Sequence, residues 1–142
     1  METQQEANRQ ELQLQIEEWI SDILFFAQDL SFTKHLLDHF YEELIRYENL
    51  DEIREEIQRF EDLRYSCGKL LDRTRTHLQH FDSTPDIPNL GASSELMKTQ
   101  EILKEKFNRF MGEFKAVKSD IFGMIGTVLE HQKVLRNSLR SA

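Results

Sequence analysis

Residues 16–47 read IEEWISDILFFAQDLSFTKHLLDHFYEELIRY, and this stretch decides the fold. Apolar or neutral side chains recur in it at alternating steps of three and four. The series is Ile16, Trp19, Ile23, Phe26, Leu30, Thr33, Leu37, Phe40, Leu44 and Tyr47. A mean step of 3.5 residues is typical of helices wound around one another, and such a stripe must be buried against partners. We therefore predict one long, unbroken helix over residues 4–47.

Two further stretches repeat the pattern. Asn49 can cap a second helix, for which we predict residues 51–81 and which places Arg64 at a core-like step. A third series of heptad steps predicts a helix over residues 94–136. No alternation of period two is sustained anywhere, so strands are not expected. The predicted fold is all-α, with three long helices in an up-down-up antiparallel bundle and coiled-coil-like heptad packing.

The predicted linker covers residues 82–93. It contains both prolines of the chain, Pro85 and Pro88, among Asp, Ser, Thr and Gly residues. Fully extended, it could return the chain to either end of the bundle. A chain of 142 residues suits one domain with a real core, so residues 1–142 are interpreted as one helical-bundle domain.

Charge is unevenly distributed along the chain, whose net charge is −8. Residues 1–49 carry eleven acids and three bases, whereas residues 93–142 carry six acids and nine bases. An acidic first third is a poor match for phosphate backbones, so nucleic acid is not an expected partner. The opposite charges of the first and last thirds favour two helices lying side by side.

The chain offers no signal for a membrane or an oxidising compartment. Its longest apolar run is far shorter than the roughly 20 residues that a membrane span requires, and the N-terminus lacks the pattern of a signal peptide. The single cysteine, Cys67, excludes an intrachain disulfide and permits a reducing compartment. We expect a cytoplasmic protein without membrane contact.

Histidines provide the only candidate metal ligands. His35 and His39 are four residues apart, a spacing that metal sites on helices use. The heptad phase turns both rings toward water, so they are weak candidates for a divalent ion. His77 and His80 are likewise interpreted as solvated surface histidines. No histidine follows a glutamate by three residues, as the usual di-iron carboxylate motif requires.

Catalytic signatures are missing from the sequence. It contains no glycine-rich phosphate loop and no serine in a nucleophile-elbow pattern. Cys67 falls at a core-like step, where a thiol is an inert packing group. We therefore predict no catalytic residue, no cofactor and no enzymatic activity.

The third helix carries surplus apolar residues between Ile121 and Leu129, where no residue is charged, and the first helix shows a matching excess. The residues concerned are Phe25 and Phe32 of the first helix and Phe122, Ile125 and Leu129 of the third. Gly123 and Gly126 fall on the outward side of the same stretch. Either the three-helix core is wide or bends at these glycines, or the residues form a contact surface for another chain, most simply a second copy.

The resulting functional hypothesis is a non-enzymatic protein–protein interaction or scaffolding bundle, acting as a homodimer or with another protein. The alternative is a bundle that binds a small ligand or a divalent metal through His35 and His39, or through a polar seam residue such as Arg64.

Overall fold

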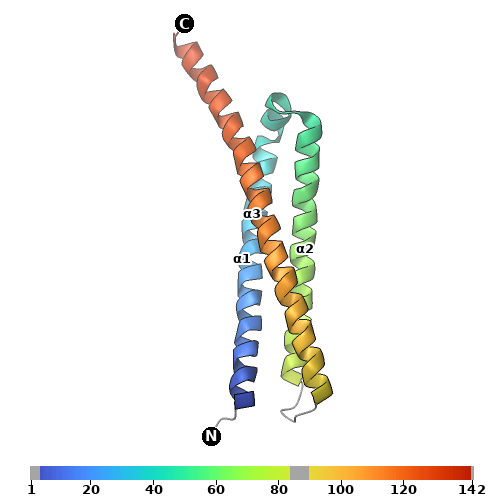
Figure 1. Ribbon diagram of the computed structural model, residues 1–142. Coiled ribbons are helices and arrows are strands. Elements are labelled where there is room, and N and C mark those ends of the chain that lie inside the picture. Colours follow the sequence, from blue (N-terminus) through green and yellow to red (C-terminus); the bar gives the residue numbers. More distant parts are fainter. Residues whose placement is uncertain (1–3, 84–89, 142) are drawn as a thin grey trace.

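The computed structural model describes residues 4–83 and 90–141, and the side chains within 9–83 and 95–140. The described residues form three helices: α1 (Gln4–Tyr47), α2 (Leu50–Ser83) and α3 (Leu90–Ser141). Figure 1 shows α1 and α2 as an antiparallel hairpin, with α3 running back in the direction of α1 and obliquely across it. Every helix packs against both others. The predicted all-α, up-down-up bundle is confirmed.

The predicted helix boundaries are correct for α1 and too short for α2 and α3; α2, predicted over residues 51–81, spans Leu50–Ser83. α1 has the predicted bounds, whereas α3 begins at Leu90 rather than residue 94 and ends at Ser141 rather than residue 136. Pro88 is the last strong helix breaker before α3, so nothing in residues 90–93 prevents the helix from starting there. Both ends of the predicted linker 82–93 are therefore helical, and its residues 84–89 lie outside the described part of the chain.

Asn49 joins α1 to α2. Its side-chain Oδ1 accepts hydrogen bonds from the backbone N–H groups of Asp51 at 2.9 Å and Glu52 at 3.3 Å. Its carbonyl oxygen accepts from the Ile53 N–H at 3.0 Å. These bonds satisfy N–H groups that a helix start leaves without partners, so the predicted N-cap is confirmed. The tight turn holds α1 and α2 side by side.

Aromatic rings join the middle of α1 to α3. Trp19 stacks on Phe107 with ring centroids 6.0 Å apart, and Phe26 lies 4.7 Å from Phe114 and 5.7 Å from Phe110. Large aromatic side chains remove the most apolar area from water and gain further from tilted ring contacts. We call these five residues the aromatic section. They place α3 against the predicted seam of α1.

The buried stripe of α2 lies one residue away from the predicted one at several steps. The predicted heptad series is Ile53, Ile57, Phe60, Arg64, Cys67, Leu71, Thr74, Leu78 and Phe81. Arg64 is exposed, and Leu63, Leu70 and His77 are buried instead. From Phe60 onward the buried residues alternate in steps of three and four. The full buried set is Ile53, Phe60, Leu63, Cys67, Leu70, Thr74, His77 and Phe81. α2 takes this rotation because it contacts α1 on one side and α3 on the other. The interpretation of His77 as a solvated histidine was wrong.

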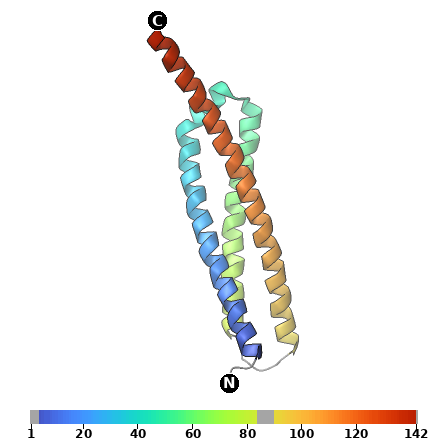
Figure 2. The ribbon, with the colours of Figure 1, turned by 60° about the vertical axis from the view of Figure 1, so that its left-hand side comes forward.

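α3 extends past the α1–α2 turn. The Tyr47 and His131 rings stack 5.0 Å apart near the point where α1 ends. Beyond it, Val134, Leu135 and Leu139 are exposed, and Figure 2 shows this end of α3 projecting past the hairpin. Leu135 follows the buried Val128 by one heptad, yet it is exposed because the hairpin stops short of it. Among the described residues, no helix is long and apolar enough to cross a membrane.

Candidate interaction surface

Four of the five predicted interface residues lie on the surface of the bundle. Phe25 is 63% exposed and Phe32 58% exposed on α1, while Phe122 is 38% and Leu129 46% exposed on α3. We call these four residues the aromatic face. Ile125 is the exception, because it is only 5% exposed within the core. The buried series in this part of α3 is Ile121, Ile125 and Val128, so helix rotation turns Ile125 inward and leaves Met124 half-buried.

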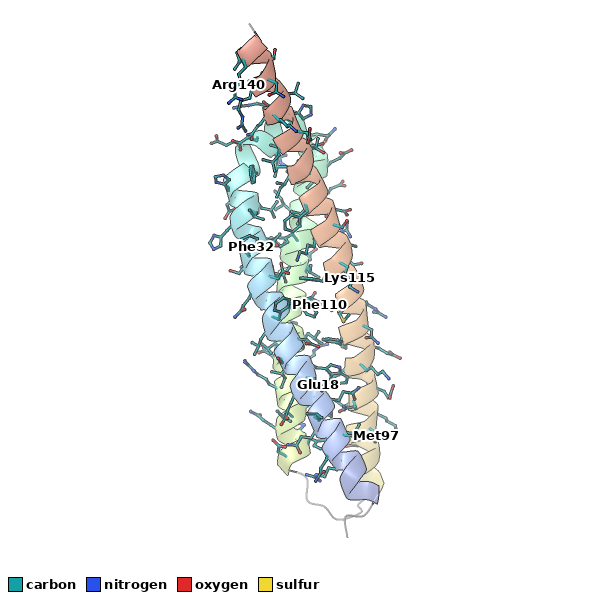
Figure 3. All side chains as sticks on the ribbon, turned by 90° about the vertical axis from the view of Figure 1, so that its left-hand side faces the viewer. Glu18, Phe32, Met97, Phe110, Lys115 and Arg140 are labelled. Atoms are coloured by element: carbon teal, nitrogen blue, oxygen red, sulfur yellow. The ribbon has the colours of Figure 1, made fainter. Side chains whose placement is uncertain are left out.

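Phe25 and Phe32 share the outer side of α1. They are seven residues apart, about two turns, so their side chains point in nearly the same direction. The buried residues Ile16, Ile23 and Leu30 occupy the opposite side of the helix. Figure 3 labels Phe32 on α1. Burying these rings requires something outside this chain, since their own helix turns them from the core.

An ion pair joins α1 to α3 near residues of the aromatic face. Lys118 Nζ on α3 lies 2.6 Å from Asp29 Oδ2 on α1. Asp29 is within one turn of both Phe25 and Phe32, and Lys118 Nζ lies 5.7 Å from the centre of the Phe122 ring. The Asp29 side chain is largely buried, so its charge-assisted bond to Lys118 is less screened by solvent than an ordinary surface pair. The ion pair therefore joins α1 to α3 at the level of these three rings.

The glycines of α3 leave open space. A Cβ built on Gly123 or on Gly126 would meet no atom within 4 Å other than those of its own helix. Close packing inside the chain therefore does not require either glycine. Gly126 lies between Phe122 and Leu129 on the helix surface, one turn from each. Each glycine lowers the stability of the helix by about 1 kcal/mol relative to alanine. No contact within the chain explains why glycine occupies these two positions.

The histidines predicted as weak metal candidates are both exposed on α1. Within the described residues, no group of three or more His, Cys, Asp or Glu side chains is arranged to hold a metal ion. Among the described residues, no such group completes a metal site with His35 and His39. The metal-binding alternative therefore remains a prediction from the sequence.

Arg64, the polar seam residue of the other alternative, turns outward. Its guanidinium lies 3.3 Å from Glu61 on the same helix and 6.0 Å from the centre of the Phe60 ring. It borders a hollow of about 190 Å³ between α1 and α2. Pockets for small organic ligands usually measure about 300–1,000 Å³, so this hollow is small for such a ligand.

Hydrogen-bonded polar side chains form a layer inside the bundle that was not predicted from the sequence. His77 Nε2 lies 2.6 Å from Gln100 Oε1, and the Gln100 amide nitrogen donates to Gln15 Oε1 at 3.0 Å. An amide oxygen only accepts, so the ring Nε2 of His77 carries the proton of this bond. The layer joins all three helices. The sequence does contain a pattern that places these residues in the core. His77 follows Leu63 and Leu70 at heptad spacing, and Gln100 precedes Phe107 by seven residues.

Among the described residues, burial raises the pKa of two ionisable side chains. Burial raises the pKa of the Cys67 thiol, which donates to the Ile23 carbonyl oxygen at a Sγ–O distance of 3.7 Å. This thiol is less reactive than an exposed one, because the thiolate is the nucleophile. Burial also raises the pKa of Glu56, although nearby Arg59 opposes the shift. Neither group adjoins a second reactive side chain that would suggest catalysis.

Comparison with known proteins identifies no relative. No protein-family model matches the chain, and no curated protein or solved structure is significantly similar to it.

Proposed function

We propose that this chain is a non-enzymatic interaction or scaffolding module that associates with a second copy through the aromatic face. The observation that carries the proposal is the exposure of Phe25 and Phe32, at 63% and 58%, on the side of α1 opposite the core. Contiguous exposed apolar patches on a soluble domain usually mark contact sites. A free cysteine, Cys67, supports a reducing, cytoplasmic setting as part of the proposal.

A pair of substitutions three residues apart tests this proposal. Phe122→Glu places a charge on the aromatic face and should weaken self-association while leaving helical content nearly unchanged, because the ring is already part-exposed. Ile125→Glu buries the same charge in the core and should unfold the chain. Light scattering over a range of concentrations gives the mass, and circular dichroism gives the helix content. An unchanged mass for folded Phe122→Glu contradicts the proposed contact.

The glycines supply a second, matched comparison. Gly126→Ala should stabilise the isolated helix by about 1 kcal/mol, yet weaken association by crowding the aromatic face. Gly112→Ala also adds a methyl group to α3 where nothing lies within 4 Å, and it serves as the control. It should stabilise the chain by a similar amount without changing the association. Equal association of both variants excludes a close approach at Gly126.

A further inference from the structure

A groove with basic walls runs between α2 and α3. It encloses about 380 Å³, and Leu63, Leu70 and Phe110 contribute its apolar lining. Five cationic side chains and two carboxylates also line it: Arg59, Lys69, Arg73, Lys106, Arg109, Asp62 and Glu113. This excess of positive charge contrasts with a chain whose net charge is −8. The groove therefore attracts an anionic partner despite the overall charge.

Three of the five cations are uncommitted. Arg59 is already paired with Asp120 at 3.1 Å and with Glu113 at 3.6 Å, and Lys69 lies over the Tyr65 ring. Arg73, Lys106 and Arg109 have no carboxylate within ion-pair distance among the described side chains. All three are exposed. An incoming acidic group could pair with them without breaking an existing ion pair.

The complementary surface lies on α1 of the same protein. Glu11, Glu17, Glu18 and Asp22 are exposed, and none has a cation within ion-pair distance among the described side chains. Glu18, labelled in Figure 3, lies seven residues before Phe25 on α1. The outer side of α1 therefore presents carboxylates followed by exposed aromatic rings.

We infer that the α2/α3 groove of one copy receives the outer side of α1 from a second copy. The inference rests on the proposed self-association and specifies which surface meets Phe25 and Phe32, the α1 part of the aromatic face. Phe25 and Phe32 are one heptad apart, as are Leu63 and Leu70 along the groove. A parallel approach of the two α1 helices places Glu17 and Glu18 toward the end of the groove that holds Arg73 and Lys106. It places the two rings toward the Leu63 end, because α2 runs antiparallel to α1.

This contact is heterologous. In a three-helix bundle the α2/α3 groove and the outer side of α1 face opposite directions. A neighbour whose α1 fills the groove of one copy therefore cannot also receive the α1 of that same copy in its own groove. Each copy then has one donor surface and one receptor surface, and association continues beyond the dimer unless a ring closes. Salt screens exposed charge pairs, with a Debye length of about 10 Å at 0.1 M, so association should weaken as salt rises.

A mixing experiment tests the inference. The groove variant Arg73→Glu/Lys106→Glu keeps an intact α1, and the α1 variant Phe25→Ser/Phe32→Ser keeps an intact groove. All four sites are exposed, so both variants should fold, which circular dichroism checks. Alone, each should self-associate about tenfold or more weakly than wild type, equivalent to about 1.4 kcal/mol. Mixed, they should form a 1:1 heterodimer that grows no further in sedimentation velocity.

The controls separate the two claims. Arg54→Glu/Lys115→Glu makes the same charge change at exposed sites away from the groove and should associate like wild type. If only the α1 variant loses association, the aromatic face is used but the groove is not its receptor, and the inference fails alone. A mixture without heterodimer also overturns it. A wild type that stays monomeric at every concentration overturns both the inference and the proposed self-association.

Discussion

Gln100 and Phe107 occupy the same stripe of α3, one heptad apart, and stabilise the bundle in different ways. Phe107 packs against Trp19 and Phe26 of α1. Gln100 is equally buried but bonds His77 of α2 and Gln15 of α1. The aromatic section stabilises the bundle by removing apolar area from water. In the polar layer, the hydrogen bonds must first offset the free-energy cost of dehydrating the polar groups. The comparison suggests that the first provides stability and the second fixes the alignment of the helices.

The largest expected effect comes from the aromatic section. Phe107→Ala should lower the free energy of unfolding by about 3–5 kcal/mol, because it removes two ring contacts and leaves a cavity. Phe107→Leu keeps most of the volume and should cost clearly less. Urea unfolding followed by circular dichroism measures both. If the alanine variant loses less than about 1 kcal/mol, the aromatic section is not the main source of stability.

An intermediate effect is expected in the polar layer. Gln100→Ala should cost about 1–3 kcal/mol, because it leaves His77 Nε2 and Gln15 buried or part-buried without their partner. His77→Leu/Gln100→Leu removes both partners of the His77–Gln100 bond and leaves only Gln15 unpaired, so it should cost less than Gln100→Ala. If the layer fixes helix alignment, the double variant should show additional amide signals by NMR, as helices slip between heptads. A single sharp set of signals contradicts that role.

The smallest expected effect concerns Glu56, a polar group that the bundle buries imperfectly. Its Oε2 lies 3.4 Å from Arg59, while Oε1 is buried and has no hydrogen-bond partner among the described residues. Since burial raises the pKa of Glu56 above its ordinary 4.5, the folded state holds this proton more tightly than the unfolded state. The stability of wild type relative to Glu56→Gln should therefore fall as pH rises through the range just above 4.5.

Unfolding free energies of both proteins, measured from pH 4 to pH 7 in about one-unit steps, test the sign of that change. A difference that is independent of pH, or one that grows with pH, contradicts the raised pKa. Asp62→Asn offers a matched control, because Asp62 is an exposed carboxylate on the same helix.

Local chemistry allowed much of the bundle to be predicted. The seam of α1 identified its buried residues, because every apolar step kept phase from Ile16 to Tyr47 and no breaker interrupted it. Asn49 marked the start of α2, since an amide side chain can satisfy the free N–H groups of a first turn. These features depend on neighbouring residues along one helix, and so the sequence contains them in full.

Only the packing of the helices decided the rest. Where a stripe is wide, as on α2 and on α3 near Ile125, several helix rotations bury similar apolar area. Neighbouring helices then choose among them, which is why Ile125 and His77 turned inward and Arg64 outward. The basic α2/α3 groove has the same origin. Its cations are separated by more than thirty residues of sequence between Arg73 and Lys106, and only an antiparallel pairing of α2 and α3 brings them together.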